Sequence, residues 1–330
     1  MSIVVVDSAA AAPAAADIKG FDFIVDSEMG PVNTRVYRAA DGNKTRVAYA
    51  LHGMESEVGV NGWESGTDAA ETLAAANVNV VLPIGGRTSF WTDWKAPSTP
   101  GLDCFAAFLP QINDSPHVGS SSGSADELKQ RQAYKWETFL TRDLPTALHD
   151  RLGFQRVRNA IFGVSMGGGA ALTLAAYHPG QFSFVGSFSG FPNISAPLMP
   201  EAIRLAVLVK SGLNIDCMWG PPWNPMWRRN DPFVSAPRLK AAHTRVYIGS
   251  GTGIPTAEDL SNPPGTAVDL GIGLGLEALA FANSKAFELR LHELDYDNVT
   301  YDFWPQGIHS WPHWRTHVKP MIADLITHVG

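Results

Sequence analysis

The sequence has few cysteines: its 330 residues contain only Cys104 and Cys217. Two cysteines cannot supply the four ligands of a structural zinc site, nor the several bridges of a small disulfide-rich domain. They can form one disulfide across a long loop in an exported protein, or they can remain two buried thiols. The sequence leaves both arrangements open.

Long hydrophobic runs and excess positive charge are also missing. No stretch reaches the roughly eighteen consecutive apolar residues that a membrane-spanning helix needs. Lysine and arginine total 25 against 32 aspartates and glutamates, a net charge of −7, which argues against a protein whose main task is to grip a phosphate backbone. We therefore expect no nucleic-acid partner. Hydrophobic residues make up 45% of the chain, which excludes disorder over its whole length.

The N-terminal segment differs in composition from the rest of the chain. Residues 9–16 are almost all alanine, as at the end of a secretory signal, but no basic segment precedes them. We interpret residues 1–17 as a flexible tail or as the remnant of an export signal. This interpretation predicts a secreted or cell-envelope protein.

From residue 46 onward, hydrophobic periodicity predicts strands that alternate with helices. Such alternation is typical of β-α-β units, which build a mostly parallel sheet covered by helices on both faces. The expected strands cover residues 46–51, 78–82, 157–162, 183–188, 245–248 and 300–304, after a hairpin of 21–25 and 34–37. The expected helices cover residues 67–76, 136–152 with a kink at Pro145, 166–177, 201–210 and 276–289, with a last helix capped by Ser310. Residues 18–330 thus form one α/β domain, with 95–133 as an inserted loop.

The motif Gly163-Val164-Ser165-Met166-Gly167 follows an expected strand and opens a helix of small residues. In this context G-x-S-x-G forms a tight turn that presents its serine at the top of the sheet and at a helix N-terminus. Ser165 is therefore the candidate nucleophile, and the Met166 N–H is a candidate oxyanion donor. Residues 119–123 match the same pattern without flanking elements and are interpreted as loop. Residues 249–253 lack the third glycine of a dinucleotide fingerprint.

A serine nucleophile needs a histidine base, and His309 has the most suitable position. It lies after the last expected strand and before the last helix, from where a base reaches over the sheet. His309, His313 and His317 recur every four residues, but Ser310 stands where the zinc-protease pattern requires glutamate. We therefore expect no metal and no cofactor. For the acid that orients the histidine, the pattern alone leaves Glu258 or Asp259 and Glu277 as alternatives.

Several strings identify a resemblance to the antigen 85 mycolyltransferases, within a broader esterase group. The strings Tyr134–Leu140, Met218–Pro221 and Arg229–Pro232 are far more specific than the serine turn. The further matching strings are Asn61–Trp63, Leu82–Gly86, Ser89–Trp94, Ala175–Pro179 and His309–Trp311. Together they extend from about residue 20 to the C-terminus.

This resemblance implies an α/β-hydrolase fold and transfer of a mycolyl chain at the cell envelope. In the family the acid precedes the catalytic histidine by 32 residues, which selects Glu277 for a triad with Ser165 and His309. The segment Leu51-His52-Gly53-Met54 matches the family segment that supplies the second oxyanion donor, which would here be the Met54 N–H.

The resemblance also implies the partners. The donor would be trehalose monomycolate, and the acceptor would be a hydroxyl of trehalose monomycolate, arabinogalactan or a protein, with peripheral contact to outer envelope lipids. The alternative function is a carboxylesterase that hydrolyses related lipid esters, which the motif does not distinguish from a transferase.

The sequence departs from the family where the sugar should bind. The family has an aspartate and an arginine that help to hold trehalose, and this chain has His52 and Glu55 instead. We expect His52, Glu55 and Trp311 to contact substrate, in an acceptor pocket that differs from a trehalose-specific one. The segments Trp219–Trp227 and Ile203–Leu208 are candidate walls of an acyl groove, or simply core packing.

Overall fold

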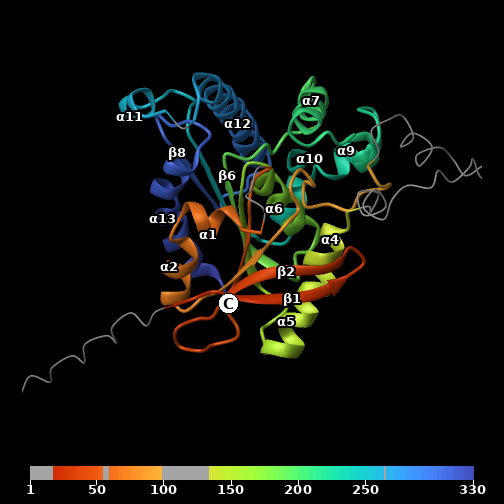
Figure 1. Cartoon of the computed structure of the whole chain (residues 1–330), viewed down its shortest axis with the longest axis vertical. Helices are drawn as coiled ribbons and strands as arrows, with labels where there is room; N and C mark the ends of the chain where they lie inside the picture. The colour runs from red at the N-terminus through yellow and green to blue at the C-terminus, as the bar shows by residue number, and fades with distance from the viewer. Residues whose placement is uncertain (1–17, 55–58, 99–133, 264) are drawn as a thin grey trace, which may run out of the picture.

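The computed structural model describes residues 18–54, 59–98, 134–263 and 265–330. The predicted tail at 1–17, the predicted sugar contact Glu55 and most of the predicted loop at 95–133 lie outside these residues. Figure 1 shows the described chain as a central sheet with helices on either side.

The described sheet has eight strands in the order β1-β2-β4-β3-β5-β6-β7-β8. All neighbouring pairs from β4 to β8 are parallel, whereas β1 and β2 form an antiparallel hairpin and β2 pairs antiparallel with β4. The strands are β1 (Phe21–Ser27), β2 (Gly30–Tyr37), β3 (Val47–Leu51), β4 (Asn79–Pro83), β5 (Asn159–Val164), β6 (Phe182–Phe188), β7 (Arg245–Ser250) and β8 (Val299–Phe303). This topology confirms the predicted α/β class with a mostly parallel sheet.

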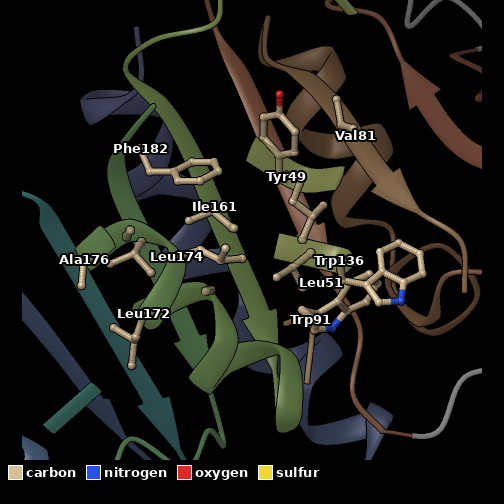
Figure 2. Close-up of a cluster of buried hydrophobic side chains, with 14 of the residues drawn as sticks. Tyr49, Leu51, Val81, Trp91, Trp136, Ile161, Leu172, Leu174, Ala176 and Phe182 are labelled. Carbon is tan, nitrogen blue, oxygen red and sulfur yellow. The ribbon is translucent and has the colours of Figure 1, made fainter. Parts of the chain in front are cut away.

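Side chains of the central strands alternate between two hydrophobic cores, because successive residues of a strand point to opposite faces. Tyr49, Leu51 and Ile161 enter the core of one face, which Figure 2 shows together with Trp91 and Phe182. The helical segments over this face are α4 (Trp136–Thr138), the π-helical turn η2 (Phe139–Asp143), α5 (Leu144–Leu152), α6 (Met166–Tyr177), α10 (Pro232–Ala241) and α12 (Ala267–Glu293). Ala48, Ala50 and Phe162 enter the opposite core, under α1 (Gly62–Gly66), α2 (Ala69–Ala75) and α13 (Trp311–His328).

A third core lies under α7 (Met199–Ser211), α8 (Asp216–Trp219) and α9 (Pro225–Arg229). Trp219 and Trp227 are buried there, so these two residues of the candidate groove wall pack into a core, whereas Trp223 between them is exposed. Cys217 belongs to the same core and is disulfide-bonded. The other cysteine of the sequence, Cys104, lies outside the described residues.

Two helices differ from their predicted form. Helix α12 begins at Ala267 and not at 276, because Thr266 and Asp269 form a capping box at its start. Its glycines at 271, 273 and 275 lower helix propensity and so concealed this first part. In the predicted helix 136–152, Pro145 is accommodated by the η2 turn, in which the Leu144 N–H donates to the Phe139 carbonyl. Within the described residues, no helix combines the length and apolar content that crossing a bilayer requires.

Candidate active site

Ser165 occupies a strained turn between β5 and α6. Its φ of 56° and ψ of −122° are unfavourable for a residue with a side chain. The neighbouring glycines are required by space: a Cβ at Gly167 would lie 2.5 Å from the His52 carbonyl oxygen, and one at Gly168 would lie 2.7 Å from Ser187 Oγ. Close packing of β5, α6 and β3 therefore selects glycine and leaves the serine side chain partly exposed at the end of the strand.

The segment after β3 approaches Ser165 closely. A Cβ at Gly53 would lie 3.3 Å from the Ser165 Cβ, so Gly53, the residue before Met54, borders the serine. Met166 is the first residue of α6, where a backbone N–H has no acceptor within its own helix. The two predicted oxyanion donors, Met54 and Met166, thus lie in segments that adjoin Ser165.

Glu277 and His309 are in direct contact. The Glu277 Oε2 is 2.8 Å from the His309 Nδ1, although the two residues lie in α12 and in the loop after β8. The Glu277 side chain is fully buried, and that of His309 is 9% exposed. This geometry holds the imidazole with Nδ1 toward the acid, which leaves Nε2 for another partner. Of the two alternatives for the acid, Glu277 is the one in contact with His309.

Three donors that the sequence did not reveal hold the other oxygen of Glu277. The Ser189 Oγ donates to Oε1 at 2.7 Å, the Gly251 N–H at 2.7 Å and the Ser250 Oγ at 3.2 Å. Ser189 follows β6, and Ser250 and Gly251 end or follow β7. The Trp314 indole in turn donates to the Ser189 Oγ at 2.8 Å. The only sequence signal for these partners is their position directly after predicted strands.

Phe191 connects the two halves of the site. It lines a small cavity together with Ser165, Met166 and Trp219. Its ring centroid also lies 6.1 Å from that of His309. The cavity has a volume of about 30 Å³, enough for roughly two water molecules. Its walls are mainly apolar and aromatic, so it would accept hydrocarbon more readily than sugar.

The predicted substrate contact of His52 is not supported. His52 is fully buried, with Nδ1 2.7 Å from the Gly53 carbonyl oxygen and Nε2 2.6 Å from that of Gly85. Burial lowers the pKa of the imidazole, so it stays neutral near pH 7, and whichever nitrogen carries the proton donates to a backbone carbonyl. The ring packs against Trp91 and cannot grip a sugar in this position.

The predicted substrate contact of Trp311 stays a prediction, and the structure shows a packing role for its indole. Its indole covers Gly62 and Gly66 of α1, and a Cβ on either glycine would collide with the ring. It also makes edge contacts with Trp63 and Trp314. Trp311 therefore docks α13 on α1, and it does not line the cavity beside Ser165.

Three of the sequence strings that resemble the family, 134–140, 175–179 and 229–232, contact one another through an ion-pair cluster. Glu137 of the string 134–140 accepts from Arg229 Nη1 at 2.8 Å, and its Oε1 lies 2.9 Å from the Nε2 of His178. Burial alone would raise the pKa of Glu137, but the hydrogen bonds from His178 and Arg229 hold it below its ordinary value. Asp231 belongs to the same string as Arg229, residues 229–232. It caps α10 by accepting from the Phe233 N–H at 2.9 Å. Glu137 also lines the cavity beside Ser165, so this cluster adjoins the site.

Metal ligands do not cluster near these residues. In the part of the chain that the structure describes, no three histidine, cysteine, aspartate or glutamate side chains come together to hold an ion. His317 stacks on Trp304 with ring centroids 3.9 Å apart, so it does not share a site with His309.

Comparison with known proteins places the chain among esterases. The model of the Putative esterase family matches residues 28–325. The chain is 34% identical over 284 residues to the diacylglycerol acyltransferase/mycolyltransferase Ag85C of Mycobacterium avium, covering 86% of this chain and 71% of the relative. It is 32% identical over 293 residues to Ag85B of Mycolicibacterium smegmatis, covering 88% and 79%.

Solved structures show the same fold. The crystal structure of Mycobacterium tuberculosis MPT51 (FbpC1) matches with a TM-score of 0.74 and 25% identity, covering 97% of this chain and all of the other. An S-formylglutathione hydrolase from Agrobacterium tumefaciens matches with a TM-score of 0.62 and 17% identity, covering 96% and 98%. The α/β-hydrolase fold that the family resemblance implied is confirmed.

Proposed function

The chain belongs to the Putative esterase family and, within it, to the antigen 85 mycolyltransferases, and from this premise we propose that it transfers a mycolyl chain through an acyl-enzyme on Ser165. The observation that carries the proposal is the buried contact between Glu277 and His309, made at the same sheet edge as the serine turn. Serine, acid and histidine in this chain order are typical of α/β-hydrolases.

In the proposed first step, His309 Nε2 takes the proton of the Ser165 hydroxyl as the oxygen attacks the ester carbonyl of the donor. Glu277 orients the ring through Nδ1 and stabilises the imidazolium that forms. The N–H groups of Met54 and Met166 would stabilise the tetrahedral oxyanion, each worth about 3 kcal/mol. The imidazolium then protonates the leaving alcohol, and the acyl group remains on Ser165.

In the second step an acceptor hydroxyl loses its proton to His309 and attacks the acyl carbonyl. The bond between that carbonyl and the Ser165 oxygen then breaks, and the imidazolium returns its proton to Ser165. Transfer and hydrolysis differ only in whether this nucleophile is an alcohol or water. We propose trehalose monomycolate as the donor, and a hydroxyl of trehalose monomycolate, arabinogalactan or a protein as the acceptor. Because His52 is buried under the site, the sugar must be held by groups other than this side chain.

A lipid donor fits the apolar surroundings of the site. Helices α7 and α12 adjoin each other through Met199 and Asn283, and both present exposed hydrophobic side chains. These exposed residues are Leu205, Leu208 and Val209 on α7, and Val268, Ile272 and Leu289 on α12. The cavity beside Ser165 has room for only a few carbons, so most of a long acyl chain would lie outside it.

Export to the cell envelope is part of the proposal. The disulfide of Cys217 supports it, because disulfides persist mainly in oxidising compartments. Fractionation of the producing cells should recover the protein outside the cytoplasm, and recovery in the cytoplasm alone would contradict this part.

The proposal is tested by incubating the protein with trehalose monomycolate and identifying the products by mass spectrometry. Trehalose dimycolate, or a mycolylated glycan or protein, establishes transfer and names the acceptor. Free mycolic acid without any transfer product would establish the carboxylesterase instead.

The nucleophile is tested separately with a fluorophosphonate probe. We expect the probe to label Ser165 in the wild type, and we expect Ser165→Ala to lose about 10⁴-fold or more of turnover with its fold unchanged, because the triad acts through this hydroxyl. Labelling of another serine with Ser165 unmodified would reject the assignment.

A further inference from the structure

The rejected alternative for the acid, Asp259, forms a second acid–histidine pair. His313 Nε2 lies 3.0 Å from Asp259 Oδ1 and 2.9 Å from Oδ2. The two side chains are only 11% and 7% exposed. Asp259 belongs to α11 (Ala257–Ser261), after β7, and His313 belongs to the first turn of α13, four residues after His309. The pair therefore ties together two segments that both lead to the proposed triad.

Backbone hydrogen bonds join the same two segments. The Gly253 N–H donates to the Gly307 carbonyl at 2.9 Å, and the Gly307 N–H donates to the Ile254 carbonyl at 2.8 Å. Packing there is tight, since a Cβ at Gly251 would lie 2.8 Å from the Gly307 oxygen. One segment starts with the Gly251 N–H that holds Glu277, and the other ends at His309. A shift between them would move the base relative to its acid.

The contact with His313 is additional to the capping of a helix. Asp259 Oδ2 accepts from Thr256 N at 2.8 Å and from Thr256 Oγ1 at 2.7 Å in a capping box. Thr266 and Asp269 form a capping box at the start of α12 with the same two distances. Asp269 is exposed, and none of its described hydrogen bonds comes from a histidine. Capping alone therefore explains neither the burial of Asp259 nor its contact with His313.

We propose that the Asp259–His313 pair is a clamp that positions His309 for proton transfer. The inference rests on the proposed function of Ser165, Glu277 and His309. His309 is held on one side by Glu277 and on the other by the chain between Gly307 and α13, and the clamp fixes that chain against α11. Misplacing a catalytic group by about 1 Å can cost on the order of a hundredfold in rate. Asp259 and His313 touch no reacting atom in this scheme and are positioning residues.

The test compares four variants with the wild type, using kcat and KM for a short-chain p-nitrophenyl ester and the rate at which a fluorophosphonate labels Ser165. His313→Leu and Asp259→Asn weaken the clamp. His313→Gln keeps an N–H donor near the position of Nε2. Asp269→Asn is the matched control, because it changes the equivalent residue of the other capping box. The melting temperature and the hydrogen exchange of residues 304–310 are measured on every variant.

We expect His313→Leu and Asp259→Asn to lower kcat and the labelling rate by about tenfold to a hundredfold, with KM within about twofold of the wild type. Exchange at residues 304–310 should become faster, His313→Gln should regain most of the rate, and Asp269→Asn should behave as the wild type.

The proposal is overturned if His313→Leu keeps the wild-type kcat, or if the variants change only the melting temperature, which would make the pair purely structural. A wild-type protein that is not labelled at Ser165 would instead reject the proposed function, and the clamp with it.

Discussion

At the scale of single residues, the carboxylate of Glu277 is the most constrained group of the site. One oxygen accepts three hydrogen bonds, from Ser189, Ser250 and Gly251, and the other faces His309. A buried carboxylate needs such partners, because removal from water is otherwise costly. The three donors fix which oxygen is left for the imidazole, and so they fix the orientation of the ring.

Glu277→Gln should therefore lower kcat by about 10⁴-fold, the effect of the equivalent change in a well-studied serine protease. A glutamine offers one acceptor oxygen where two are used, and its NH₂ would face either the three donors or the Nδ1 proton of His309. Steady-state kinetics measure the loss. Glu258→Gln, at an exposed position of α11, is the control and should retain wild-type activity. Equal losses in both variants would contradict the role of Glu277.

At the scale of elements, α13 is positioned by the contact of Trp311 with α1. The glycines at 62 and 66 leave the surface of α1 open for the indole, which also meets Trp63 at 5.5 Å between ring centroids. Because α13 begins two residues after His309, this docking helps to set where the histidine loop ends. A packing residue thus occupies a place where the family-like string suggested a substrate contact.

Gly62→Ala should lower the free energy of unfolding by about 1–3 kcal/mol, because the added methyl group overpacks a filled contact. Gly271→Ala in α12 is the matched control: nothing lies within 4 Å of its Cβ position. That exchange should stabilise the protein by about 0.5–1 kcal/mol through helix propensity. Denaturant titrations of both variants measure the difference. A destabilised Gly271→Ala together with an unaffected Gly62→Ala would refute the packing argument.

At the scale of the whole molecule, Glu137 joins segments that are distant in the sequence. It lies in α4, contacts His178 at the end of α6 and forms an ion pair with Arg229 of α9. Because these contacts hold its pKa below the ordinary value of about 4.3, the ionised form stabilises the fold. That contribution is present above the unfolded-state pKa and is lost as the pH falls through the lower folded-state pKa.

Glu137→Gln should accordingly reduce the free energy of unfolding at pH 7 by about 1–3 kcal/mol, since Arg229 loses a largely buried partner. The difference from the wild type should shrink as the pH falls from the unfolded-state pKa of Glu137 through its lower folded-state pKa, because the wild-type carboxylate then becomes protonated. Urea titrations at several pH values measure it. Glu293→Gln removes an exposed partner of Arg290 and should change stability by about 1 kcal/mol or less. A loss at Glu137 that does not depend on pH would contradict the electrostatic origin.

The identity of the triad acid shows how much of the site sequence patterns could predict. They placed Ser165 and His309 at strand ends but left Glu258, Asp259 and Glu277 open, and only the family resemblance selected Glu277. Glu277 lies within a helix, far along the chain from the serine, and its contact with His309 depends on how α12 packs. The pattern also could not show that Asp259 pairs with His313 instead.

The sequence by itself determined the serine turn and the order of strands and helices, because both arise from local sterics and hydrophobic periodicity. Gly163 and Gly167 flank Ser165 because a tight strand-to-helix turn leaves no room for a side chain at either position. The tertiary structure alone decided that His52 is buried, that Trp311 packs on α1 and that Glu277 receives three donors. Each of these depends on which surfaces meet when distant segments bury their apolar area, and the residue type alone does not specify that partner.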